Sequence, residues 1–331
     1  MTKDKPLPVI NLITGNDTRS NANMFDEVVG QKSPIKQIKF YISSHSANSP
    51  FPTVLLQGGH GLGKTHLSKK ISESLNRRFI EINSETIASK DSFIEEIILN
   101  RVIGDSTVTL FFDEAHGLPS QIVSMLLTML SPNDKNKNII SFNNYNIEWD
   151  MSKINTIFAT NEHCKIPVAL RNRCVSIILS QYTNKELVDM VNLYLPKDII
   201  IKANEDEIAY LCRGRARGAY LFSVDIEREC RLYNTKIFDD NRLENLKETI
   251  INYGFPLGLL KEEVDMMNFI KEESPISAYN LSIKLMVEEE TITQDYEIRP
   301  RELGLIANTG KGRELTQKGI EYLDRLLVLE N

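Results

Sequence analysis

The segment that most limits how this chain can fold is Gly58-Gly59-His60-Gly61-Leu62-Gly63-Lys64-Thr65, which fits the pattern GxxxxGK[ST] at every fixed position. Glycines here let the backbone curl so that several N–H groups point at phosphate oxygens. Lys64 would reach the β and γ phosphates of ATP, and the Thr65 hydroxyl would hold Mg²⁺. The loop, together with the adjoining His66, therefore predicts a nucleotide site.

Such a loop requires a strand before it and a helix after it. Residues 53–57 (Thr-Val-Leu-Leu-Gln) have the composition of a buried strand, and Leu67, Ile71 and Leu75 recur at helical spacing. Further short apolar runs alternate with helical patterns, at 78–82, 108–112, 156–159 and 175–179. This alternation predicts an α/β fold with a parallel sheet flanked by helices.

The chain divides into four segments by pattern. Residues 1–24 mix polar residues without periodicity and predict a flexible tail, whereas 25–180 carry the α/β pattern. Thr183-Asn184-Lys185-Glu186 has the form of a capping box and opens a helical domain over 181–253. Helical patterns and a Gly-rich turn then predict a small third domain over 254–331.

Composition limits the class of protein. No run of about 18 apolar residues occurs and the amino terminus lacks a signal-peptide layout, so we expect a cytoplasmic protein without a membrane span. The four cysteines, Cys164, Cys174, Cys212 and Cys230, lack C-x-x-C spacing, and we expect them to be reduced and buried. A net charge of −6 argues against coating nucleic acid by overall charge, so DNA contacts must be local.

Hydrolysis also needs a metal-ordering acid and a base for water. The apolar run 107–112 delivers Asp113 and Glu114 to the carboxyl edge of the predicted sheet, beside the phosphates. Asp113 suits the Mg²⁺ shell, and Glu114 suits polarising the attacking water. An acidic pair after a strand can equally be a solvated turn, but its position about fifty residues after a phosphate loop favours catalysis.

Two further polar positions complete the predicted site. The run 155–161 ends in Thr160 and Asn161, either of which could orient water against the γ phosphate. Arg173 lies just before the last apolar run, at the far edge of the predicted domain. A cation there is poorly placed for its own nucleotide and would act on a neighbour's as an arginine finger, unless it is an ordinary surface arginine.

This ordered set resembles the AAA+ ATPases, and within them the RuvB family of Holliday-junction branch-migration motors, from Phe25 to about Thr316. The resemblance implies a parallel-sheet ATPase domain, a helical lid and a C-terminal winged-helix domain, working as a hexameric ring. The matching segments are 25–31, which includes Val29 near the adenine, and the Walker A, Walker B, sensor 1 and arginine-finger segments at 61–65, 110–116, 159–161 and 170–173.

A segment between Walker B and sensor 1 favours RuvB over its relatives. Residues 138–149 form two apolar runs around an Asn pair, a pattern typical of a β-hairpin. The RuvB family has a hairpin at this point that docks its partner RuvA. The resemblance therefore implies a RuvA-like partner, with Phe142 and Tyr145 as candidate contacts.

The carboxyl terminus supplies the second RuvB-like feature. Residues 254–306 followed by Thr309-Gly310-Lys311-Gly312-Arg313 are similar in length and order to the family's winged-helix domain. Residues 251–331 carry 9 Lys and Arg against 15 Asp and Glu, so phosphate attraction depends on local cations. We expect DNA contact at Lys311 and Arg313.

One position departs from the family. The family places a sensor 2 arginine shortly after an Arg-Gly pair, and here Arg217-Gly218 is followed by Leu221 where that arginine would fall. Either Arg217 replaces it, or ATP-driven closure of the lid is weaker than in the family.

The sequence thus predicts an ATP-driven ring that translocates duplex DNA at four-way junctions. A sliding-clamp-loader subunit is the alternative, because residues 169–174 also resemble the Ser-Arg-Cys segment of that branch. A nucleotide-binding scaffold with little hydrolysis is a third interpretation, which Lys64, Asp113 and Glu114 oppose.

Overall fold

The computed structural model describes residues 22–46, 49–102, 107–131, 137–142, 145–249 and 255–329. The chain forms two compact units, residues 1–180 and 181–331. Short helix η1 (Ala22–Phe25) begins inside the segment predicted as a tail, and residues 1–21 lie outside the described part.

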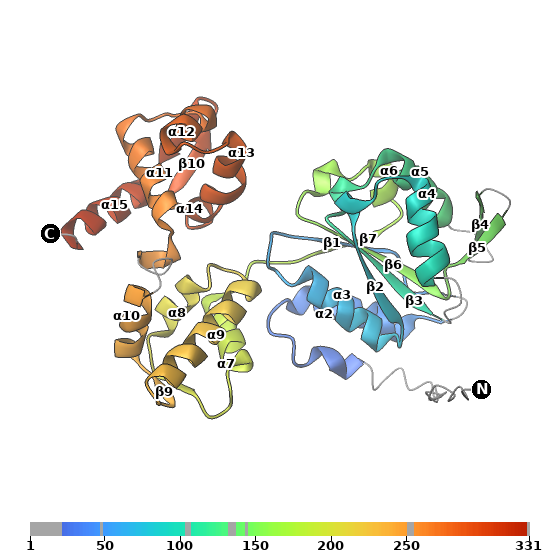
Figure 1. Ribbon diagram of the computed structural model, residues 1–331, viewed down its shortest axis with the longest axis horizontal. Coiled ribbons are helices and arrows are strands. Elements are labelled where there is room, and N and C mark those ends of the chain that lie inside the picture. The colour runs from blue at the N-terminus through green and yellow to red at the C-terminus, as the bar shows by residue number, and fades with distance from the viewer. Residues whose placement is uncertain are drawn as a thin grey trace, which may run out of the picture. The chain divides into compact units, whose positions relative to one another are not determined.

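Unit 1 is built on a five-stranded parallel sheet in the order β2-β3-β6-β1-β7, seen in Figure 1. Each strand coincides with a predicted apolar run, so the parallel-sheet prediction is confirmed. The strands are β1 (Val54–Gln57), β2 (Arg78–Asn83), β3 (Val108–Asp113), β6 (Ile154–Thr160) and β7 (Val175–Ile178).

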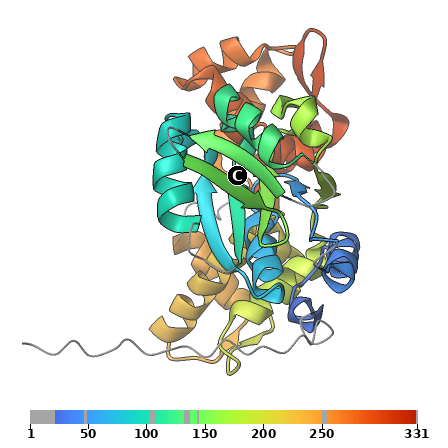
Figure 2. The same cartoon turned by 90° about the vertical axis from the view of Figure 1, so that its right-hand side faces the viewer.

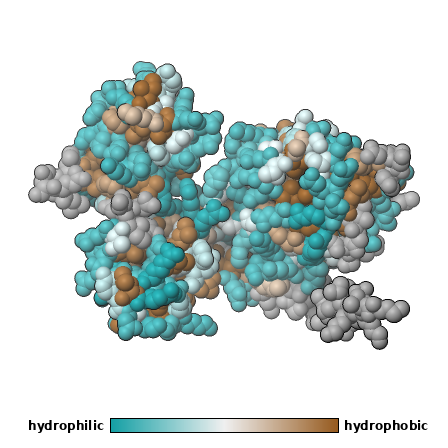
Figure 3. All heavy atoms as spheres, in the orientation of Figure 1, coloured by the Kyte–Doolittle hydropathy of each residue, from teal (hydrophilic) through white to brown (hydrophobic). Residues whose placement is uncertain are grey.

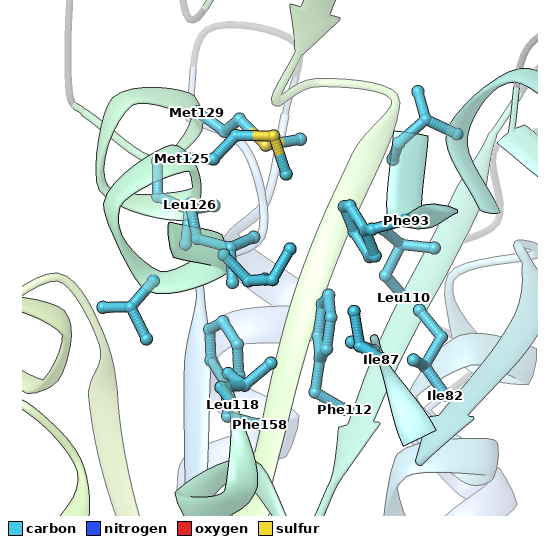
Figure 4. Packing of buried hydrophobic residues seen from close by; sticks show 14 of the residues in the cluster. Ile82, Ile87, Phe93, Leu110, Phe112, Leu118, Met125, Leu126, Met129 and Phe158 are labelled. Carbon is cyan, nitrogen blue, oxygen red and sulfur yellow. The ribbon is translucent and has the colours of Figure 1, made fainter. Parts of the chain in front are cut away.

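Helices cover both faces of this sheet, as Figures 1 and 2 show. One face packs against α3, and the other carries Phe112 and Phe158 into a cluster with Phe93 and Leu126 (Figure 4). The two faces differ because successive strand side chains point to opposite sides. The helices are η1, α2 (Lys32–Ser44), α3 (Lys64–Ser74), η2 (Ser84–Thr86), α4 (Lys90–Ser92), η3 (Phe93–Val102), η4 (Ala115–Gly117), α5 (Ser120–Met129), η5 (His163–Lys165) and α6 (Val168–Arg171).

The predicted hairpin is also present in unit 1. Strands β4 (Lys137–Phe142) and β5 (Tyr145–Asp150) pair antiparallel and form a sheet of their own. Trp149 is fully buried, and the Asn138 amide donates to the carbonyls of Met129 and Ser131, each at 2.9 Å. These contacts anchor the hairpin to the end of α5.

Unit 2 begins with the predicted helical lid. The predicted capping box exists: Thr183 Oγ1 accepts from the Glu186 amide at 3.3 Å, and Glu186 Oε2 accepts from the Thr183 amide at 2.9 Å. A Cβ on Gly218 would lie 2.0 Å from the Cys212 carbonyl oxygen, so only glycine fits there. The elements are α7 (Asn184–Tyr194), β8 (Ile200–Ile201), α8 (Glu205–Leu211), α9 (Ala216–Leu232), β9 (Ile237–Phe238) and α10 (Asp240–Thr249).

The rest of unit 2 is the predicted winged-helix domain, with its own apolar core. Gly310 and Lys311 form the turn between two antiparallel strands, 306–309 and 312–315, which confirms the wing. The predicted boundary at residue 253 lies outside the described residues. The elements are η7 (Pro256–Gly258), α11 (Lys261–Glu272), α12 (Ala278–Leu285), α13 (Glu289–Thr291), η8 (Ile292–Tyr296), α14 (Ile298–Glu302), β10 (Ile306–Thr309), β11 (Gly312–Leu315) and α15 (Gln317–Leu329).

The surface in Figure 3 is mostly hydrophilic, with scattered apolar residues. Among the helices of the described residues, none combines the length and apolar character needed to cross a bilayer.

The cysteines correct one expectation. All four are free thiols, but Cys164 is exposed rather than buried, because it lies in the surface turn η5. Burial raises the pKa of both Cys174 and Cys212 to about 12, and it also raises the pKa of Cys230. These three thiols therefore have little thiolate near neutral pH.

We expect the exposed Cys164 thiol to react rapidly with a disulfide reagent at pH 8. The thiols of Cys174, Cys212 and Cys230 should react only on unfolding. The reason is that the thiolate is the reactive form, and raised pKa values suppress it. Absorbance of the coloured thiolate released from the reagent measures the rate of thiol reaction. Cys164→Ser should remove the fast phase. More than one fast thiol in the native protein would contradict this assignment.

Candidate ATPase site

The phosphate loop joins the end of β1 to the start of α3. Gly61 and Gly63 take left-handed backbone angles, with φ of 73° and 89°, which glycine adopts without strain. A Cβ on Gly58 would lie 3.1 Å from the Leu179 Cβ and 3.2 Å from the Leu62 Cδ1. The glycines predicted from the pattern are therefore required by this backbone.

Lys64 is held inside the loop it terminates. Its Nζ donates to the carbonyl oxygens of Gly58 at 2.8 Å and Gly59 at 3.0 Å, and only 8% of the residue is exposed. Burial lowers the pKa of the Lys64 ammonium, while the nearby Glu114 and Asp113 carboxylates oppose that effect. A partly desolvated ammonium of this kind gains strongly from a bound phosphate.

The acidic pair lies where the sequence places it, at the end of β3. Phe112 pairs in register with Phe158 of β6, and their rings stack with centroids 5.1 Å apart (Figure 4). Asp113 follows, and its Oδ1 accepts from the Glu114 amide at 3.1 Å. Glu114 then turns into a left-handed conformation with φ of 45°, which ends the strand.

Sequence reasoning missed His116, which lies beside Glu114, and Glu162, which lies on the other side of the His116 ring. The His116 Nδ1 lies 3.5 Å from Glu114 Oε2 and 3.2 Å from the Thr160 hydroxyl, and its Nε2 lies 3.4 Å from Glu162 Oε1. Glu114 Oε2 is buried and accepts no hydrogen bond from the described part of the chain. The position of His116, two residues after Glu114, was the one signal in the sequence.

Asn161 follows β6 and meets the phosphate loop. The Gly58 amide donates to the Thr160 carbonyl at 3.2 Å, which fixes the end of β6 beside the loop. The Asn161 Nδ2 lies 2.5 Å from His60 Nε2, and His60 Nδ1 lies 3.9 Å from Glu114 Oε1. The structure thus brings the Walker A, Walker B and sensor 1 segments to one edge of the sheet.

Arg173 lies at the opposite end of the strands, where β1 and β7 begin. It precedes β7, whose Val175 pairs with Val54 at the start of β1 rather than at its end. Its guanidinium donates to the Ala169 carbonyl at 2.9 Å and contacts the Ser131 hydroxyl at 3.5 Å. Within its own unit this arginine is therefore separated from the phosphate loop by the length of a strand.

Two remaining nucleotide candidates are Val29, in the loop before α2, and Arg217, in α9. Val29 is half-buried, and two residues later the Gln31 amide exchanges hydrogen bonds of 2.7 and 2.9 Å with the Ser180 backbone, which fixes this segment beside the strand end at Leu179. In the lid, Arg217 is exposed in the first turn of α9. Leu221 follows one turn later and is 53% exposed.

The two wing cations differ in environment. Lys311 is exposed at the turn between β10 and β11. Arg313 is half-buried, and its Nε donates at 2.8 Å to the Glu297 carboxylate, which is 2% exposed. Arg313 therefore holds the wing against η8 and α14, and Lys311 is the better placed of the two for a phosphate.

The structure also changes the interpretation of Phe142 and Tyr145, the two hairpin residues predicted to contact a partner. Phe142 is 7% exposed and belongs to the core cluster, which argues against a contact with a partner. Tyr145 lies in β5, and its side chain lies outside the described residues. Ile139, which sequence reasoning did not single out, is 64% exposed on the outer face.

The fold and the site geometry define a P-loop ATPase with a lid and a winged helix. Residues 54–182 match the family described as ATPase family associated with various cellular activities (AAA), and residues 256–324 match the RuvB C-terminal winged helix domain.

The chain is similar to RuvB proteins along nearly its whole length. The RuvB subunit of the Holliday junction branch migration complex from Mycoplasma genitalium is 27% identical over 307 residues, covering 91% of this chain and 96% of that protein. The Fervidobacterium nodosum subunit is 26% identical and covers 94% and 90%. The Thermotoga maritima RuvB motor structure has a TM-score of 0.75 at 22% identity, covering 90% and 96%. The chain is a RuvB-like AAA+ ATPase, an enzyme that hydrolyses ATP.

Proposed function

We propose that this protein is a motor of the RuvB type that uses ATP hydrolysis to move duplex DNA at Holliday junctions. The observation that carries the proposal is the presence on one chain of an AAA ATPase domain followed by a RuvB winged-helix domain. The curated relatives carry the name of a branch migration subunit. A clamp loader is not favoured, because its usual collar is purely helical whereas this terminus carries a wing.

The residues at the sheet edge fit ATP and Mg²⁺. Gly61 and Gly63 adopt the left-handed backbone angles of the phosphate loop, and the buried oxygens Glu114 Oε2 and Asn161 Oδ1 accept no hydrogen bond from the described residues. Thr65 and Asp113 would hold Mg²⁺, which would neutralise charge on the phosphates. Lys64 would bind the β and γ phosphates, Glu114 would take a proton from the attacking water, and Asn161 would orient that water.

We expect Glu114→Gln to keep nucleotide binding and to slow hydrolysis by about 100- to 10,000-fold, the usual contribution of a general base. Lys64→Ala should instead weaken nucleotide binding by about 10- to 100-fold, because a charge-assisted contact is lost. Fluorescent ADP titration and phosphate release measure the two effects. Lys69→Ala, an exposed lysine on the same helix, is the matched control. Full hydrolysis by Glu114→Gln would contradict its role.

The position of Arg173 supports a ring. Because this arginine lies at the edge of the sheet opposite its own loop, it would stabilise transition-state charge in a neighbouring subunit. We therefore propose a homo-oligomer, with a hexamer as the family's arrangement, in which each site is completed by the next subunit.

Mixing two inactive variants tests this arrangement. Arg173→Ala and Lys64→Ala should each be inactive alone, because each spoils every site. A mixture should regain ATPase activity, since an intact loop in one subunit can meet an intact arginine in the next. Each variant mixed with itself is the control. Absence of recovery at every ratio, with rings still formed by light scattering, would argue against a finger in trans.

We propose that duplex DNA contacts the wing through Lys311, and that the β4–β5 hairpin meets a RuvA-like protein through its outer face at Ile139. The wing offers an exposed cation, whereas Arg313 is already paired with Glu297. A cytoplasmic location stays a prediction.

The experiment that tests the function compares ATPase rates with a four-way junction, linear duplex and a primed template. Junction or duplex stimulation of a six-membered ring is expected, and stimulation only by primed template with a clamp would support a loader.

Lys311→Glu should reduce the salt slope of DNA binding by about one, because one phosphate contact is lost. Lys261→Glu, at an exposed lysine of the same unit, is the charge-matched control.

A further inference from the structure

His60 lies at a variable position of the phosphate-loop pattern, where the pattern itself asks for no particular side chain. In the structure it contacts both other motifs of the site. Its Nε2 lies 2.5 Å from the Asn161 amide nitrogen, and its Nδ1 lies 3.9 Å from the Glu114 carboxylate. The ring is 54% exposed, so its position is set by these polar contacts rather than by burial.

The chemistry of the three groups gives this contact a direction. The Asn161 Nδ2 can only donate, so the His60 Nε2 that faces it acts as the acceptor. In the tautomer that accepts at Nε2, the ring proton is on Nδ1, the nitrogen that faces Glu114. His60 thus connects the water-orienting amide to the water-activating carboxylate from within the loop that binds the phosphates.

We propose that His60 is a positioning residue for hydrolysis: it holds the Asn161 amide and the Glu114 carboxylate in a fixed relation to the phosphate loop. It acts through these two residues and does not itself touch the reacting atoms. The contact to Asn161 is the shorter and carries most of the effect. The inference rests on the hydrolytic roles proposed above for Glu114 and Asn161.

Three substitutions separate the two contacts. His60→Ala removes both. His60→Gln keeps an acceptor oxygen at about the reach of Nε2, and His60→Asn keeps a donor at about the reach of Nδ1. DNA-free ATPase kinetics of each variant give kcat and KM, and fluorescent ADP titration reports whether the loop still binds nucleotide.

We expect His60→Ala to lower kcat about fivefold, the size of one ordinary hydrogen bond, while KM and ADP affinity change less than about twofold. His60→Gln should recover most of the loss, and His60→Asn should stay close to alanine. In an Asn161→Ala background, His60→Ala should have almost no further effect, because its main target is gone.

Several results would overturn the inference. They are an unchanged kcat in His60→Ala, a loss of ADP binding that makes His60 a binding residue, equal activity of the Gln and Ala variants, or full additivity with Asn161→Ala. A wild-type protein without ATPase activity would remove the proposed function and this inference together. If the wild type is active and Glu114→Gln is not, a negative His60 result concerns His60 alone.

Discussion

The register of the parallel strands is the constraint on which the site depends. Gln57 at the end of β1 pairs with Thr160 of β6, and Phe112 of β3 pairs with Phe158 of the same strand. These pairings bring the residues that follow the strands to one edge, where Lys64 enters the glycine loop. A slip of one residue would turn every side chain to the opposite face and would separate the carboxylates from the phosphate loop.

A buried charge pair gives unit 2 its own constraint. Arg213, in the turn after α8, contacts the Glu263 carboxylate of the winged-helix domain at 2.6 Å and donates to the Gly258 carbonyl at 2.8 Å. The Glu263 side chain is 1% exposed, so separating the pair would leave a buried charge without its partner, at a cost of about 3 to 5 kcal/mol. This pair therefore ties the turn after α8 to the start of α11 in the winged-helix domain.

Local patterns predicted most of this fold. Apolar runs, a capping box and turn residues each act over a few neighbouring positions, which is why the strands, the lid helix at Thr183 and the wing were found. The errors lie in contacts between distant segments. The pairing of Arg313 with Glu297, the burial of Phe142 and the approach of His60 to Asn161 depend on the assembled fold, and nothing in the neighbouring sequence signals them.

The departure at Leu221 also looks different on the folded lid. Gly218 is required because α9 packs directly on the Cys212 carbonyl, so packing is sufficient to explain this glycine. Arg217 and Leu221 are four residues apart on α9 and share one face of the helix. One helical turn corresponds to about 5.4 Å along the axis, which is within the reach of a flexible arginine side chain. Arg217 therefore places a cation on the same face of α9 as Leu221, one turn earlier in the helix.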